Sequence, residues 1–271
     1  RRLPSPTGYQ NSPYPDGPID HDVPVLRVDA PDGKPRAIAF GYACHNTTTA
    51  LLQFNADYAG FAQTELEKAY PGVTALFVMG CGGDQNPYPR GKIEWAITHG
   101  KTLATSVEAA LLPKPKPIRG PLKFALKEID LPFESVTRES LLAHRESKDL
   151  YERRRVEALL AEHDKNGKIR ETYPYPVQVL QFGDLTMVTL GGEVVIDYAL
   201  RLKRELGEIP VWVAGYSNDV MAYIPSERVL KEGGYEGGGA MRYTNLPAPW
   251  RPGIENQIID TARELTQQLR R

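Results

Sequence analysis

The sequence has no apolar run of about 18 residues, the length that a membrane-spanning helix requires. Its longest apolar stretches, such as AIAF and ALFVMG, have the length of single strands. No charged and then apolar leader opens the chain, so no signal peptide is visible. The chain begins at Arg1 without a methionine. We therefore expect no transmembrane segment, and we expect the chain to be cut from a longer sequence.

The sequence also lacks an excess of positive or negative charge, and it has few cysteines. The 33 Lys and Arg residues balance 34 Asp and Glu residues, which leaves a net charge of −1. Nucleic-acid-binding domains usually gather a basic excess on one face, so we expect no nucleic-acid partner. The two cysteines, Cys44 and Cys81, are too few for a disulfide framework. One bridge and two buried thiols both stay open.

A chain of 271 residues can bury a substantial core, and we expect one large domain, 1–271. Residues 1–24 are rich in Pro, Gly, Asn and Asp, which predicts an extended surface arm. The segment VLRVDAPDGKPRAIAFGYAC predicts a hairpin, DYAGFAQTELEKAYPG a helix, and TALFVMG a strand with both faces covered. Strand, helix and strand in this order imply a right-handed crossover and a partly parallel sheet.

The second half alternates strands and helices in the same way. Residues 138–165 predict a long, highly charged helix, exposed within an insertion that spans 137–170. The other expected elements are a helix over 93–112, a strand over 122–133, two strands around a Gly-Asp turn in YPVQVLQFGDLTMVTLGGE, a helix directly after Glu193, a strand in VWVAGYSND, a short helix near Ser226 and a closing helix from Ile254. Together they predict an α/β fold with a mixed, largely parallel central sheet flanked by helices.

Polar or glycine-rich clusters follow four of the apolar strands. They are GYACHN, MGCGGDQNP, TLGGE and VAGYSND. Ligand sites of α/β sheets lie at the carboxyl ends of the strands, where the loops converge. The four clusters therefore predict one common pocket.

Residue chemistry alone suggests three metal ligands, with two alternatives for the third. His45, Glu193 and either Asp84 or Tyr223 offer the nitrogen and oxygen donors that zinc accepts. Structural roles compete with this interpretation at each position. His45 is open to a purely hydrogen-bonding role, Glu193 to that of a first-turn acid favoured by the helix dipole, and Tyr223 to that of a core residue.

Other motifs do not support a site. GYSND resembles the nucleophile elbow of hydrolases, but Asp219 occupies the position that requires Gly. GCGGDQNP lacks the Gly-Lys-Ser/Thr ending of a phosphate loop. Asp20, His21 and Asp22 are interpreted as a solvated turn of the Pro-rich arm. The remaining histidines are treated as surface or structural residues: His99, His144 and His163.

Five segments taken together carry a family resemblance. They are ACHNTTTA, ADYAGFAQTELE, ALFVMGCGGDQNP, LGGEVVIDYALRLK and VAGYSNDVMAYIPSERVLKEGGYEGG. In order and approximate interval they resemble the N-terminal catalytic domain of neutral, non-lysosomal ceramidases. The resemblance covers nearly the whole chain and is weakest in the charged helix.

The resemblance implies a zinc ion held by two histidines, a glutamate and a tyrosine. The family's second histidine falls on His45, its glutamate on Glu193 and its ligand tyrosine on Tyr223. A further active-site tyrosine of the family, twelve residues after the ligand tyrosine, falls on Tyr235. The arginine that the family places near the substrate amide falls on Arg1, or else on Arg2.

Two departures from the family pattern bear on activity. The first zinc ligand of the family belongs to a His-x-His segment upstream of Arg1, so three of four ligands are expected in this chain. The catalytic serine of the family's Gly-Asp-x-Ser-Pro motif aligns with Asn86. An amide cannot act as a nucleophile, but it can hydrogen-bond a carbonyl or a developing oxyanion. Asp84 is expected to hold the metal ligands in place through hydrogen bonds, or to act as a general base.

The resemblance therefore implies a hydrolase with Zn²⁺ as its cofactor, which cleaves the N-acyl amide of a ceramide-like small-molecule lipid. It also implies access to substrate at a membrane surface and a secreted or periplasmic location. One alternative is a non-catalytic protein of the same fold that binds a lipid or glycan, with Asn86 as its mark. The other is a zinc hydrolase of a different amide or of an ester. The oligomeric state is not predicted.

Overall fold

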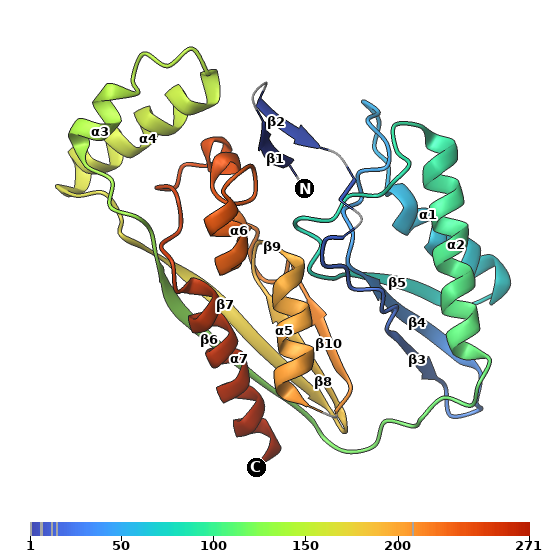
Figure 1. Ribbon diagram of the computed structural model, residues 1–271. Coiled ribbons are helices and arrows are strands. Elements are labelled where there is room, and N and C mark those ends of the chain that lie inside the picture. The colour runs from blue at the N-terminus through green and yellow to red at the C-terminus, as the bar shows by residue number, and fades with distance from the viewer. Residues whose placement is uncertain (1, 6–7, 12, 15, 208) are drawn as a thin grey trace.

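The computed structural model of the chain describes residues 2–5, 8–11, 13, 14, 16–207 and 209–271. Helices flank mixed sheets, which confirms the expected α/β class (Figure 1). The strands lie in separate sheets of three and four strands, with two further short pairs. No helix in the described ranges is both long and apolar enough to cross a membrane.

The three-stranded sheet has the order β3-β4-β5. β3 (Val25–Asp29) and β4 (Pro35–Tyr42) form the expected antiparallel hairpin, and β5 (Thr74–Met79) pairs parallel to β4. α1 (Asp57–Ala69) provides the crossover between them and packs against α2 (Ile93–Leu111), as Figure 1 shows on the right. The apolar side chains of this unit form one buried cluster, whose fully buried members include Ile38, Phe40, Ala62, Leu66 and Val107.

The four-stranded sheet has the order β10-β8-β7-β6. β6 (Leu122–Pro132), β7 (Thr172–Phe182) and β8 (Leu185–Leu190) are antiparallel neighbours, and β10 (Val211–Ala214) runs parallel to β8. A two-residue turn joins β7 to β8, and such a turn can connect only antiparallel strands. Both sheets are therefore mixed and not largely parallel as predicted. The pairs β3–β4, β6–β7 and β7–β8 are antiparallel, whereas β4–β5 and β8–β10 are parallel and have a helix between their strands along the chain.

Two helices contribute to the main buried cluster beside this sheet. α5 (Ile196–Leu206) contacts β10, and α7 (Ile254–Arg270) contacts β6 and β7. Side chains of both helices and of the inner strands make up the cluster. Ser226 is the N-cap of α6 (Glu227–Glu232), and its hydroxyl accepts a hydrogen bond from Val229 N.

The two sheets meet at the carboxyl ends of β5 and β10. The backbone N–H of Gly215 donates to Met79 O at 3.1 Å. Gly41 lies against the Trp212 ring so closely that an added Cβ would be 2.9 Å from Trp212 Nε1. A short parallel pair, β9 (Glu193–Val194) and β11 (Tyr223–Ile224), lies beyond the end of β8. The strand-end loops of both sheets therefore come together.

The charged segment forms two helices rather than the single helix predicted over 138–165. α3 (Arg138–Ala143) ends before a turn, and α4 (Leu150–Asn166) starts afresh because the Asp149 carboxylate accepts hydrogen bonds from the backbone of its first turn. The expectation of a wholly exposed insertion is also corrected. The pair has its own small buried cluster, here called the α3–α4 cluster: Leu141, Val156, Leu159, Leu160 and Ile169.

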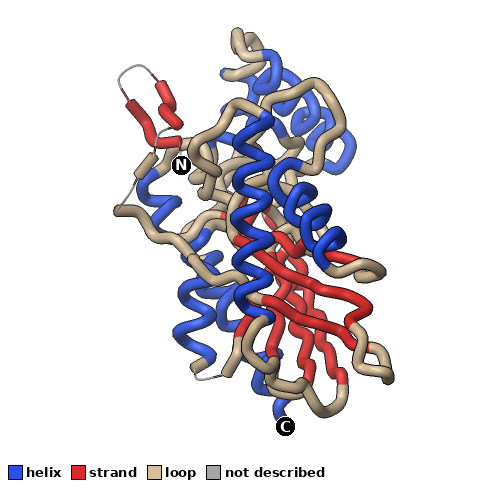
Figure 2. Tube along the Cα trace, turned by 90° about the vertical axis from the view of Figure 1, so that its right-hand side faces the viewer, coloured by secondary structure: helices blue, strands red, loops and turns tan. Residues whose placement is uncertain are grey.

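The N-terminal arm contains a hairpin of β1 (Arg2–Ser5) and β2 (Gly8–Asn11), which projects from the body in Figure 2. Further along, the expected solvated turn is wrong for Asp20, which is only 9% exposed. Lys203 Nζ lies 2.7 Å from carboxylate oxygens of both Asp20 and Asp22. This ion pair attaches the arm to α5.

Substitution of Leu159 by Ala tests whether the α3–α4 cluster is a separate unit. Leu159 is fully buried, so truncation is expected to destabilise its surroundings by about 2–5 kcal/mol. Hydrogen exchange should speed up in α3 and α4 and stay unchanged in α5. The control Leu202→Ala removes an equally buried side chain from the main cluster and should speed exchange in α5. A uniform increase along the chain in Leu159→Ala would contradict a separate unit.

Candidate active site

Backbone hydrogen bonds join the four strand-end clusters. His45 N donates to Gln85 O at 3.0 Å, and Gly83 N donates to Val194 O at 2.9 Å. Tyr216 N donates to Gly192 O at 3.0 Å. The loops after β4, β5, β8 and β10 therefore form one connected layer, which is the arrangement that the sequence predicts.

Gly83 permits the closest approach within this layer. A Cβ added there would lie 2.5 Å from Glu193 O and 2.9 Å from Val194 O. Both neighbours are backbone atoms, so a side chain could not be accommodated by a rotamer change. Gly83 thus allows the loop after β5, in the three-stranded sheet, to touch the strand that carries Glu193.

The structure brings together the three predicted ligands. Glu193 and Tyr223 are paired neighbours in the β9–β11 register. His45 Nε2 lies 3.9 Å from Glu193 Oε2 and 3.4 Å from Tyr223 Oη. Ligand atoms around a tetrahedral zinc with bonds of about 2 Å lie about 3.3 Å apart, so a nitrogen and two oxygens are near the spacing that zinc requires. Their role as metal ligands stays a prediction.

The donor set is one imidazole, one carboxylate and one phenol. Among the described residues, no group of three or more His, Cys, Asp or Glu side chains could hold a metal ion, and a site here depends on the tyrosine. Burial, followed by the charge of Glu193, raises the pKa of Tyr223 well above the usual phenol range. A divalent cation at this position would oppose both effects by favouring the phenolate.

Tyr216 completes this cluster, and the sequence did not single it out. Its hydroxyl lies 3.1 Å from His45 Nδ1 and donates to Glu193 Oε2 at 3.1 Å. Burial, then the Glu193 charge, raises the pKa of Tyr216 far above its usual range. The available signal was its position directly after β10, in the VAGYSND cluster, where the GYSND pattern was weighed only as a nucleophile elbow.

The other predicted site residues lie around this cluster. Asp84 is 5% exposed, and its Oδ1 accepts the N–H of Ile196 at 2.9 Å, at the start of α5. Its Oδ2 lies 3.5 Å from Arg228 Nη2. The observed contacts of Asp84 thus support the first turn of α5. Asn86 Oδ1 accepts the hydroxyl of Thr47 at 3.0 Å.

Tyr235 and Arg1 complete the predicted set. The Tyr235 ring meets the Tyr223 ring edge-on, with centroids 5.5 Å apart. Arg1 lies outside the described residues, and its neighbour Arg2 is the first residue of β1.

A cavity of about 680 Å³ opens beside Glu193, Tyr223 and Tyr235. Its other lining residues come from the start of β7 and the segment before it, the β10–β11 loop and the segment around the 3₁₀ helix Gly239–Tyr243: Arg170, Tyr173, Val220, Met221, Ala222, Ala240, Tyr243, Thr244, Asn245 and Leu246. Two of the three predicted ligands, Glu193 and Tyr223, thus line a cavity that is large enough for a small molecule.

Both cysteines are free and buried, so the alternative of two thiols holds in the structure. Burial raises the pKa of the Cys44 thiol to about 12, with a further contribution from Asp57. Such a thiol stays protonated at neutral pH and is a poor nucleophile.

No family model matches the sequence, and no curated protein matches it. Solved structures do match the fold, and two of them are ceramidases. Neutral ceramidase from Pseudomonas aeruginosa is 16% identical, with a TM-score of 0.64 over 92% of this chain and 47% of the ceramidase chain. A ceramidase complexed with C2 is also 16% identical, with a TM-score of 0.68 over 95% of this chain and 50% of its own. The chain thus has the fold of these ceramidases and spans about half their length.

Substitution of Gly83 by Ala tests the contact that joins the two sheets. The added Cβ collides with backbone carbonyls, so we expect a loss of about 1–3 kcal/mol in unfolding free energy and shifted NMR signals of His45 and Glu193. Gly72→Ala is the control, because Gly72 has a φ of +88° and nothing within 4 Å of an added Cβ. It should be destabilised by backbone strain alone, with the signals of the site in place. Unshifted signals in Gly83→Ala would contradict this account.

Proposed function

We propose that this chain carries the larger part of a zinc-dependent amidohydrolase site that cleaves an N-acyl amide of the ceramide type. The observation that supports it most is that three residues from distant parts of the chain meet. Tyr223 Oη lies 3.4 Å and Glu193 Oε2 lies 3.9 Å from His45 Nε2. The ceramidase-like fold gives this convergence a chemical context.

The donor set fits zinc in kind and spacing. His45 would bind through Nε2, Glu193 through its carboxylate and Tyr223 through its phenolic oxygen. By resemblance, a fourth ligand would come from an upstream His-x-His segment. When bound, zinc supplies Lewis acidity, which polarises an amide carbonyl and makes water more acidic.

The remaining predicted residues would orient the substrate. The Tyr235 hydroxyl and the Asn86 side-chain amide are hydrogen-bond donors for the amide oxygen, where negative charge develops during hydrolysis. We retain Arg1 in the same role by resemblance. Asp84 would hold Glu193 in place from the next turn of the chain, because its carboxylate accepts the N–H of Ile196, three residues after Glu193.

The cavity beside Glu193 would receive the amide and the adjoining part of a lipid. By resemblance, substrate would be reached at a membrane surface by a secreted or periplasmic enzyme. The aromatic and polar wall is also compatible with another N-acyl amide or an ester. Asn86, in place of the family serine, favours a second candidate function, namely binding of a lipid or glycan without hydrolysis.

Metal content and turnover test the proposal together. The purified protein, extended upstream to include the predicted His-x-His segment, should contain about one zinc per chain and hydrolyse an N-acyl sphingosine. A chelator should abolish turnover, and added zinc should restore it.

Substitution of Glu193 tests the ligand assignment. The variant Glu193→Gln should bind no zinc, and its kcat/KM should fall by at least about 100-fold. Glu128→Gln, on the exposed part of β6, should change neither. Turnover that survives chelation would rule out the zinc mechanism.

Substitution of Asn86 separates hydrolysis from binding. If the amide stabilises the oxyanion, Asn86→Ala should lower kcat by about 10²–10³ with little change in KM. Thr47→Val removes the hydroxyl that donates to Asn86 Oδ1 and should have a smaller effect in the same direction. Tight binding of N-acyl sphingosine with no turnover, in the zinc-loaded protein, would favour the binding function.

A further inference from the structure

The hydroxyl of Tyr216 touches two of the predicted ligands at once. Its oxygen lies 3.1 Å from His45 Nδ1 and 3.1 Å from Glu193 Oε2. The imidazole therefore has Tyr216 on Nδ1, while Nε2 faces Glu193 and Tyr223. The rings of Tyr216 and His45 meet edge-on, with centroids 6.1 Å apart.

The backbone holds Tyr216 in this place at a conformational cost. Its φ is +54°, in the left-handed region that aromatic residues rarely occupy. Three consecutive N–H groups secure the turn: Gly215 N bonds to Met79 O, Tyr216 N to Gly192 O and Ser217 N to Leu190 O. Strain of this kind persists where surrounding structure imposes it, and it is common at functional sites.

Counting protons gives two arrangements for a neutral imidazole. In the first, His45 Nδ1–H donates to Tyr216, and the Tyr216 hydroxyl donates to Glu193. The Nε2 lone pair is then available to a cation, and without one it faces the Gly83 carbonyl oxygen. In the second, Tyr216 donates to Nδ1, and Nε2–H donates to Gly83 O, which lies 3.0 Å away. Only the first leaves Nε2 able to bind a cation. It also gives Tyr216 a hydrogen bond to a carboxylate, which is about twice as strong as one between neutral groups.

We propose that Tyr216 is a positioning residue that keeps the proton of His45 on Nδ1 and, through the same hydroxyl, orients the Glu193 carboxylate. The proposal rests on the proposed zinc site and adds the residue that prepares two of its ligands. Metal-binding histidines typically donate their second N–H to such a partner, and loss of that partner typically weakens metal binding by 10–100-fold.

The test compares the wild-type protein, extended upstream as in the zinc test, with Tyr216→Phe in the same protein. This substitution removes one oxygen and keeps the ring. In mildly alkaline solution, ¹⁵N NMR should find the proton of His45 on Nδ1 in the wild type and on Nε2, bonded to Gly83 O, in the variant. Zn²⁺ affinity, measured by competition with a chromogenic chelator, should fall by about 10–100-fold. Tyr151→Phe is the matched control, because it removes a hydroxyl from a ring of α4 that is 49% exposed and does not line the cavity beside Glu193. It should leave both readouts unchanged.

The outcomes separate this inference from the proposed function. If the wild type binds no Zn²⁺, the zinc hydrolase proposal fails, and the NMR comparison still decides the role of Tyr216. The inference is overturned if His45 has the same tautomer in the wild type and in Tyr216→Phe. Equal Zn²⁺ affinity of the two proteins, with wild-type binding intact, overturns it as well.

Discussion

The contact between the glycine-rich loop after β5 and the strand that carries Glu193 is the constraint on which the site depends. His45 lies in the loop after β4 of the three-stranded sheet, whereas Glu193 and Tyr223 form the short β9–β11 pair beyond the end of β8. The hydrogen bond from Gly83 N to Val194 O, at 2.9 Å, holds these parts together where an added Cβ would collide. A metal site built from both sheets exists only if they dock in this register.

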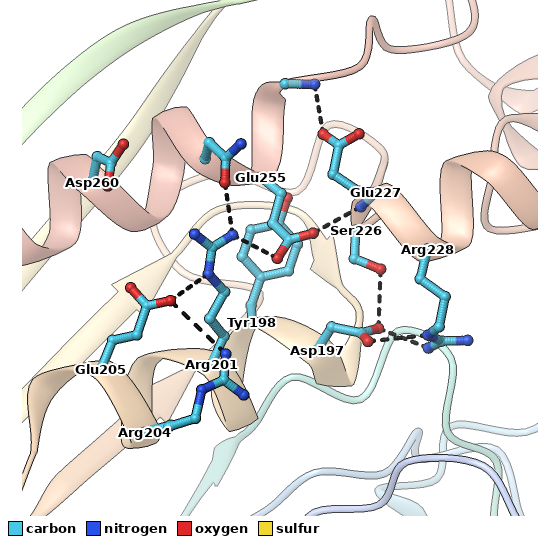
Figure 3. A network of polar contacts seen from close by, with 12 residues as sticks. Asp197, Tyr198, Arg201, Arg204, Glu205, Ser226, Glu227, Arg228, Glu255 and Asp260 are labelled. Carbon is cyan, nitrogen blue, oxygen red and sulfur yellow. Dashed lines mark hydrogen bonds and ion pairs between the residues drawn. The ribbon is translucent and has the colours of Figure 1, made fainter.

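Ion pairs between α5, α6 and α7 hold the part of the site that contains Glu193 and Tyr223. Arg228, at the start of α6, lies 2.7 Å from the Asp197 carboxylate of α5, and Arg201 lies 2.8 Å from Glu255 of α7 (Figure 3). Glu255 also accepts the N–H of Glu227 at 2.8 Å. Because β9 leads into α5 and β11 into α6, fixing these helices fixes Glu193 and Tyr223.

Local patterns predicted most elements, because apolar periodicity and turn residues act over a few positions. The strand ends also predicted the meeting of His45 and Glu193, since carboxyl ends of strands converge. The choice of Tyr223 over Asp84 came only from the resemblance to ceramidases. The break before α4 was missed because the Asp149 cap lies within a uniformly charged run. The burial of Asp20 depends on Lys203, 183 positions away, and Tyr216 on a backbone turn held from two other loops. Such long-range contacts leave no local pattern.

Anomalous diffraction at the zinc edge, from crystals grown with equimolar Zn²⁺, would test the central claim most directly. The account predicts one strong peak bonded to His45 Nε2, the Glu193 carboxylate and Tyr223 Oη, at about 2 Å from each ligand atom. Well-ordered crystals with no peak among these three side chains, or with zinc bound only elsewhere, would contradict it.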